Sequence, residues 1–168
     1  MDITVRRIEP DDGPLFAELR LRALADAPYA FSTTLAEASR QTEDDWAELA
    51  RRRADGDREA AFFAYLGDAP VGIVAGFAHD DARAVDLISM WVDPGARRHG
   101  AARALIQAVV DWARRAGHDE LHLWVSEVNA GARALYGASG FVTTADVDLL
   151  RPDSPLTERR MRLRFDPR

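Results

Sequence analysis

The stretch of sequence that decides the fold is Ser89-Met90-Trp91-Val92-Asp93-Pro94-Gly95-Ala96-Arg97-Arg98-His99-Gly100-Ala101-Ala102-Arg103-Ala104-Leu105-Ile106. Residues 84–92 are rich in β-branched and large apolar side chains, which predicts a strand. From Gly100 onward, apolar side chains recur with helical spacing, which predicts a helix over residues 101–116. Pro94 closes the strand because it has no N–H to donate. The stretch is therefore a strand, a short basic loop and a helix.

The loop between this strand and this helix has the chemistry of an anion-binding site. At a helix start, free N–H groups and the positive end of the helix dipole point toward the ligand. Arg97, Arg98 and Arg103 add positive charge, and Gly100 lets a ligand approach the backbone closely. The loop lacks the Gly-Lys-[Ser/Thr] ending of a nucleotide triphosphatase and the three glycines of a dinucleotide-binding fingerprint. We expect a phosphorylated ligand of another kind, and the alternative is an ordinary crossover with solvated arginines.

Two spaced motifs give a more specific indication. The first is Arg97-x-x-Gly100-x-Ala102, and the second is Asn129-Ala130-Gly131-Ala132-Arg133-Ala134-Leu135-Tyr136-Gly137-Ala138-Ser139-Gly140-Phe141. They resemble the [Gln/Arg]-x-x-Gly-x-[Gly/Ala] and Asn-x-x-Ala-x-x-Leu-Tyr-x-x-x-Gly-Phe patterns of the GNAT superfamily of acyl-CoA-dependent N-acyltransferases. The side chain of Asn129 is suited to cap the second motif's helix. The resemblance covers residues 73–141 and elsewhere rests on the order of elements.

The predicted elements follow the order β-α-α-β-β-β-α-β-α-β-β, and residues 1–168 read as one domain. Further strands are expected at residues 3–8, 60–66, 71–78, 120–125, 142–150 and 159–165, further helices at 13–27, 42–53 and 129–139, an irregular segment at 29–41 and a turn at 80–83. This order agrees with the GNAT fold, an α/β fold whose central sheet is mixed, as in α+β proteins. Two parallel strands of that sheet splay apart, and here they are residues 84–92 and 120–125. The resemblance implies that the pantetheine arm of acetyl-CoA lies in the gap, with its pyrophosphate on the loop.

The resemblance also implies which residues form the site. Those expected to contact the cofactor are Met90, Trp91, Val92, Arg97, Arg98, His99, Gly100, Ala101, Ala102, Arg103, Asn129, Ala132 and Tyr136. Tyr136 would act as general acid toward the departing thiolate, or else only pack against pantetheine, and a backbone N–H of Met90 or Val92 would bind the thioester carbonyl. Asp86 is a candidate general base, because a branch of the family has a Glu eleven residues before the first motif. Glu127 is a rival, and deprotonation through water is a third route.

Composition excludes several other classes of function. The chain has no Cys and no Lys, which removes disulfides, thiolate nucleophiles and Schiff-base chemistry. The four histidines, at positions 79, 99, 118 and 122, show no ligand pattern, so we expect no metal. The net charge of −6 argues against nucleic acid as a partner. No apolar run reaches the roughly 20 residues that span a bilayer, and the first residues lack a signal peptide's apolar region, so we expect no membrane contact and a cytoplasmic location.

The sequence leaves two classes of function open. The favoured one is an N-acetyltransferase that moves an acetyl group from acetyl-CoA to a primary amine of a small molecule, or of a peptide or protein N-terminus, by direct attack in a ternary complex. The alternative is a GNAT-fold protein that binds CoA as a sensor or structural element without turnover. Asn129 and Tyr136 favour the enzyme, because a binder has no need of an acid. No residue in 29–58 or in the last two predicted strands identifies the acceptor, and homodimer formation also stays open.

Overall fold

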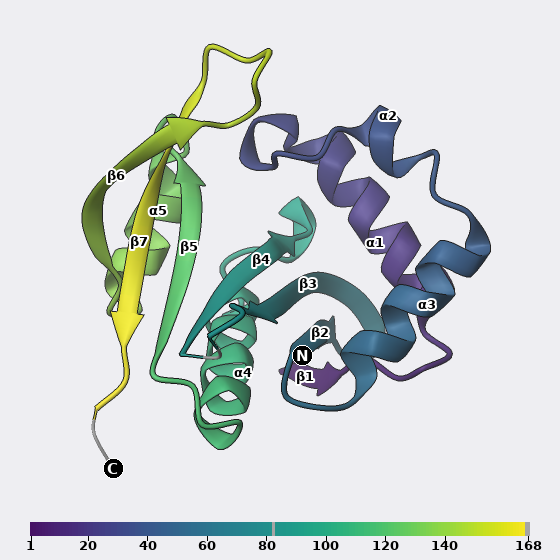
Figure 1. The fold of residues 1–168 in the computed structure, drawn as a ribbon. Helices are drawn as coiled ribbons and strands as arrows, with labels where there is room; N and C mark the ends of the chain where they lie inside the picture. Colours follow the sequence, from purple (N-terminus) through teal and green to yellow (C-terminus); the bar gives the residue numbers. More distant parts are fainter. Residues whose placement is uncertain (82, 167–168) are drawn as a thin grey trace.

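A mixed sheet of seven strands forms the centre of the computed structural model, which describes residues 1–81 and 83–166 (Figure 1). The elements are β1 (Ile3–Arg7), α1 (Gly13–Asp26), η1 (Pro28–Ala30), α2 (Leu35–Ala38), α3 (Glu43–Ala54), β2 (Glu59–Leu66), β3 (Ala69–Ala78), β4 (Ala84–Val92), η2 (Pro94–Ala96), α4 (Ala101–Arg115), β5 (Glu120–Ser126), α5 (Ala130–Ala138), β6 (Val142–Leu149) and β7 (Thr157–Arg164). The order of strands across the sheet is β1-β2-β3-β4-β5-β7-β6. The mixed α/β fold expected from the sequence is therefore confirmed.

Helices cover both faces of the sheet, and the sheet separates the hydrophobic core into two clusters. On one face, α4 buries Leu105, Val109 and Trp112, and Tyr136 of α5 belongs to the same cluster. On the other face, α1 and α3 contribute the second cluster, which includes Phe16 and Trp46. The apolar spacing of each helix explains this arrangement, because one side of the helix meets the sheet while the other faces water.

The two central parallel strands separate after a short pairing. β4 pairs with β5 only from Ala84 to Asp86, opposite Glu120 to His122. Further along β4, a bulge shifts its register with β3, and Ser89 takes a positive φ of 58°. A bulge bends the strand that carries it and increases the local twist. The splay that the resemblance implied is therefore present.

The structure departs from the predicted elements in a few places. The segment expected to be irregular contains η1 and α2, and α2 begins with a capping box in which Thr34 and Glu37 bond each other's backbone N–H groups. That Thr-x-x-Glu signature was in the sequence and was overlooked. The last strand begins at Thr157 rather than residue 159, because β7 pairs with β5 as far as Ser126. The turn predicted at 80–83 includes Ala82, which lies outside the described residues.

No helix in the described part of the chain combines the length and the apolar character needed to cross a bilayer.

Candidate active site

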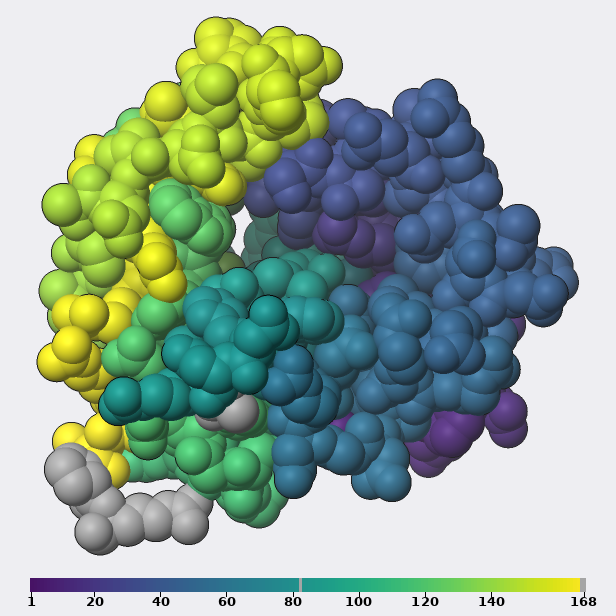
Figure 2. All heavy atoms as spheres, viewed as in Figure 1, coloured from purple at the N-terminus to yellow at the C-terminus, as the bar shows by residue number. Residues whose placement is uncertain are grey.

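A cavity of about 970 Å³ opens where β4 and β5 separate. Its walls come from α1 and the segment after it, from β4, from the loop and first turn of α4, from β5 and α5, and from β7. Figure 2 shows the molecule hollowed between the green and yellow C-terminal part and the blue and purple N-terminal part. Of the residues predicted to contact a cofactor, all except His99 line this cavity: Met90, Trp91, Val92, Arg97, Arg98, Gly100, Ala101, Ala102, Arg103, Asn129, Ala132 and Tyr136.

The basic loop leaves the start of α4 open. Gly100 is the N-cap residue, with a φ of 88° and no side-chain hydrogen bond to the first turn. A Cβ added to Gly100 would meet no atom within 4 Å, so the space beside this turn is free. The first N–H groups of a helix have no partner within the helix. Arg98 and Arg103 line the same end of α4, and no described carboxylate forms an ion pair with either guanidinium.

Three residues predicted to bind a cofactor use their side chains to hold the loop. The guanidinium of Arg97 donates to the carbonyl of Val92 at 3.1 Å and to Asp26 at 3.0 Å. The indole N–H of Trp91 donates to the same Asp26 oxygen at 3.0 Å. Nδ1 of His99 lies 3.0 Å from the carbonyl oxygen of Arg97. The motif spacing gave no sign of this second task.

The helix α5 brings the predicted acid to the cavity. Asn129 accepts a hydrogen bond from the N–H of Ala132 at 3.1 Å, which confirms its predicted role as the cap. Tyr136 is buried, and its ring meets that of Phe141 edge-on, with centroids 5.7 Å apart. Burial raises the pKa of Tyr136 well above its usual range, because the phenolate would lose its solvation. The phenol therefore keeps its proton at working pH.

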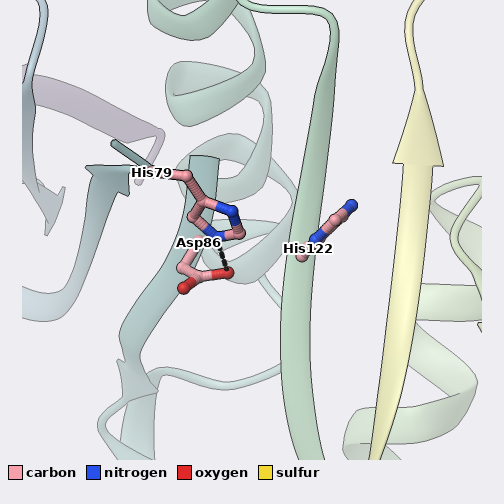
Figure 3. A group of neighbouring side chains, drawn as sticks. All are labelled: His79, Asp86 and His122. Atoms are coloured by element: carbon pink, nitrogen blue, oxygen red, sulfur yellow. Dashed lines mark ion pairs between the residues drawn. The ribbon is translucent and has the colours of Figure 1, made fainter. Parts of the chain in front are cut away.

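Asp86, the predicted base, lines the cavity at the point where the pairing of β4 with β5 ends. Its Oδ1 is 2.8 Å from Nε2 of His79, and the two side chains point toward each other in Figure 3. His122 stands opposite on β5, and the ligand atoms of the three side chains lie within 4.8 Å of one another. Sequence spacing did not predict this cluster, whose donors could hold a metal ion. However, Glu120 and Arg160 already contact the ring nitrogens of His122, and the guanidinium charge opposes a cation there.

Glu127, the rival base, is engaged in contacts with β7 that make it unsuited to accept a proton. Its carboxylate contacts the hydroxyl of Thr157 and forms an ion pair with Arg159 at 2.8 Å. The hydrogen bond from Thr157, followed by that from Arg159, lowers the pKa of Glu127. A carboxylate with a lowered pKa is a poor proton acceptor, and Glu127 does not line the cavity.

Glu158 is a carboxylate in the cavity wall that sequence reasoning missed. Burial, followed by the charge of Asp148, its partner across β6 and β7, raises the pKa of Glu158 to about 7. On its other side, Glu158 faces Ser126 of β5, whose buried hydroxyl has no hydrogen-bond partner among the described residues. Glu158 was missed because it lies just outside the strand predicted at 159–165.

Arg20 of α1 is a second residue that the sequence did not indicate. It lines the cavity with its guanidinium 4.7 Å from the ring centroid of Phe31. Its Nη1 is buried and has no hydrogen-bond partner among the described residues. Burial lowers the pKa of Arg20 to about 10, and the charge of Arg53 contributes to this shift. An arginine on a helix is too common for its position alone to signal a site.

Comparison with known proteins identifies the family. Residues 21–141 match the model of the acetyltransferase (GNAT) family, which is more than half of the chain. The chain belongs to the GNAT family of acetyltransferases. The expected resemblance is thereby confirmed, and with it the membership of a family of enzymes.

Curated relatives and solved structures agree with the GNAT assignment. The chain is 31% identical to a mycothiol acetyltransferase from Thermobispora bispora, over 86% of this chain and 48% of that protein. It thus spans about half the length of that relative. It is 31% identical to an aminoglycoside N(6')-acetyltransferase type 1 from Stenotrophomonas maltophilia, over 88% of this chain and 92% of that protein. The structure of yncA from Salmonella typhimurium with its cofactor acetyl-CoA matches the fold with a TM-score of 0.81 and 19% identity, over 100% of this chain and 96% of that one.

The raised pKa of Glu158 predicts an unusual pH dependence of stability. Between its ordinary pKa of 4.5 and about 7, the folded protein holds a proton on Glu158 that the unfolded chain has released. The contribution of Glu158 to stability therefore falls as the pH rises through this window. We expect Glu158→Gln to become more stable relative to the wild type between pH 5 and pH 8 in urea unfolding.

Glu127→Gln is the matched control, because the contribution of Glu127 to stability should change with pH in the opposite direction. Because the pKa of Glu127 is lowered in the folded state, its stabilisation is present above about pH 4.5 and is lost in acid. This variant should be less stable than the wild type at pH 7 and approach it at pH 3. A difference between Glu158→Gln and the wild type that stays constant with pH would show that Glu158 titrates normally.

Proposed function

We propose that the protein transfers an acetyl group from acetyl-CoA to the primary amine of a small molecule, by direct attack in a ternary complex. The observation that carries the proposal is one cavity that joins an open helix start, two arginines that no described carboxylate pairs with, and a protonated tyrosine. A relative that covers nearly the same length is named for acetylation of an aminoglycoside, which supports a small-molecule acceptor. An N-terminal amine of a peptide remains a second kind of acceptor.

The cofactor would bind at two places in the cavity where backbone groups of the described residues lack partners, the first turn of α4 and the gap between β4 and β5. Its diphosphate fits the first turn of α4, where N–H groups at residues 101–103 are open and Arg98 and Arg103 supply positive charge. Its pantetheine arm fits between β4 and β5, because β4 has no pairing to β5 beyond Asp86. Backbone groups that face an apolar interior need partners, and an extended amide-containing arm provides them.

The chemistry needs a base, an oxyanion site and an acid. Glu158 would take the first proton from the acceptor's ammonium, since a pKa of about 7 suits a base at neutral pH. The neutral amine then attacks the thioester carbon, with the oxyanion on a backbone N–H of Met90 or Val92. The C–S bond breaks, the thiolate receives a proton from Tyr136, and the nitrogen releases its second proton, which restores the phenol. Asp86, paired with His79, is the alternative base.

The other class of function is a GNAT-fold protein that binds CoA without turnover. It would use the same loop and the same gap between the strands. It would have no use for the proton of Tyr136 or for the acceptor side of the cavity. CoA binding and turnover therefore have to be measured separately.

One prediction of the proposed function concerns the loop. Gly100→Asp places a negative side chain in the open space at the start of α4, so the affinity for CoA should fall by at least about tenfold, or 1.4 kcal/mol. The matched control is Gly117→Asp at the other end of α4, where the glycine also has a positive φ, 84°, and open space. It should bind CoA like the wild type in calorimetric titration. Equal affinities in the two variants would refute the assignment of the loop.

Another prediction separates an enzyme from a protein that only binds CoA. Tyr136→Phe keeps the ring contact with Phe141 and removes only the hydroxyl. CoA affinity should stay the same, while turnover of an accepted amine falls by roughly 10²–10⁴-fold in a thiol-release assay. Turnover at the wild-type rate across the pH range would make Tyr136 a packing residue.

A further inference from the structure

We infer that the amine acceptor also carries a carboxylate, and that Arg20 binds this group on the α1 side of the cavity. The acceptor class is then a small zwitterionic amine such as an amino acid. This inference rests on the proposed function, because it concerns the second substrate of the same site.

The first argument is the unbalanced charge of Arg20. The described residues include no carboxylate in an ion pair with it, although its Nη1 is fully buried and its guanidinium lies against Phe31. The neighbouring Arg53 already has a partner, Glu59, at 3.4 Å. A buried cation without a partner is costly, so its presence in a cavity wall calls for an anion from outside the chain.

The second argument is the shape of the group that would satisfy Arg20. A guanidinium presents its N–H donors in a planar fork that matches the two oxygens of a carboxylate. The Nη1 donor has no hydrogen-bond partner among the described residues, and the guanidinium carbon lies over the ring of Phe31, 4.7 Å from its centroid. A carboxylate in the cavity would contact the part of Arg20 that lines the wall and would neutralise its charge.

The third argument comes from the strand wall of the same cavity. Ser126 and Glu158 are register partners on β5 and β7, so their side chains lie on one face of the sheet. The buried hydroxyl of Ser126 is unpartnered among the described residues, and Glu158 supplies a carboxylate. The cavity therefore offers a cation on its helix wall and an acid on its strand wall, which matches a molecule with one charge of each sign.

Other acceptors fit this wall less well. A polycationic amine would bring positive charge toward Arg20, and a neutral monoamine would leave the guanidinium without a partner. A peptide N-terminus carries its terminal carboxylate at a distance set by chain length. A small molecule with both groups satisfies both walls at once.

The test compares matched ligands that differ in the carboxylate alone. The common L-amino acids, β-alanine and γ-aminobutyrate are titrated by calorimetry against the protein with CoA bound, alongside the carboxamide of each. CoA has no acyl group to transfer, so binding is measured without turnover. We expect one or more acids to bind at least about tenfold more tightly than the matching amide.

Variants of Arg20 then show whether this residue reads the carboxylate. Arg20→Gln should bring acid and amide to within about twofold of each other, and Arg20→Lys should retain part of the preference because it keeps the charge. The control is Arg51→Gln on the exposed side of α3, which should behave like the wild type. Thermal unfolding of each variant confirms that it is folded.

Each outcome separates this inference from the proposed function. Acid and amide binding equally, neither series binding, or a preference that survives Arg20→Gln would overturn the role of Arg20. If thiol release from acetyl-CoA then occurs with amines that lack a carboxylate, the proposed function stands without it. If acids bind through Arg20 but no amine releases thiol, the proposed function fails while the binding inference holds.

Discussion

The pairing of β4 with β5 stops after three residues, and the rest of the site depends on where it stops. Up to Asp86 the two strands share a parallel ladder, which anchors them side by side at one end. Beyond it, the bulge at Ser89 turns β4 away, and the cavity takes the place of further pairing. Backbone N–H and C=O groups facing this gap need partners in a bound molecule or in water. The gap thus turns an ordinary parallel crossover into a binding site.

The helix α1 is tied to the same crossover by charged contacts. Asp26, at the end of α1, accepts hydrogen bonds from Trp91 and Arg97. Arg22 of the same helix forms an ion pair with Asp93. Each contact is partly exposed and contributes modest stability on its own. Their joint effect is positional, because they fix α1, and with it the wall that carries Arg20, against the strand and loop proposed for the cofactor. The wall proposed for the amine acceptor and the wall proposed for the cofactor would therefore keep a fixed position relative to each other.

Local patterns in the sequence predicted most of the fold, and in the candidate site they predicted the segments around Gly100 and Asn129. The strand and helix around Gly100 and the helix capped by Asn129 were predictable, because their signals lie within a few residues of each other. Arg20 and Glu158 were not, since their interest arises only when a helix, two strands and a cavity are brought together. The pairing of His79 with Asp86 is of the same kind, because β3 and β4 bring the two into contact. Missing partners are also invisible in a sequence, which shows that Arg20 is charged but not that its charge is unbalanced.

The central claim is that the gap between β4 and β5, together with the start of α4, is where CoA binds. Hydrogen exchange followed by mass spectrometry, with and without CoA, tests it most directly because it reports backbone amides one segment at a time. The account predicts slower exchange on CoA binding in residues 87–92 and 98–103, with β1 and β2 unchanged. CoA binding that leaves both of those segments unprotected, or that protects only segments outside the cavity, would contradict the account.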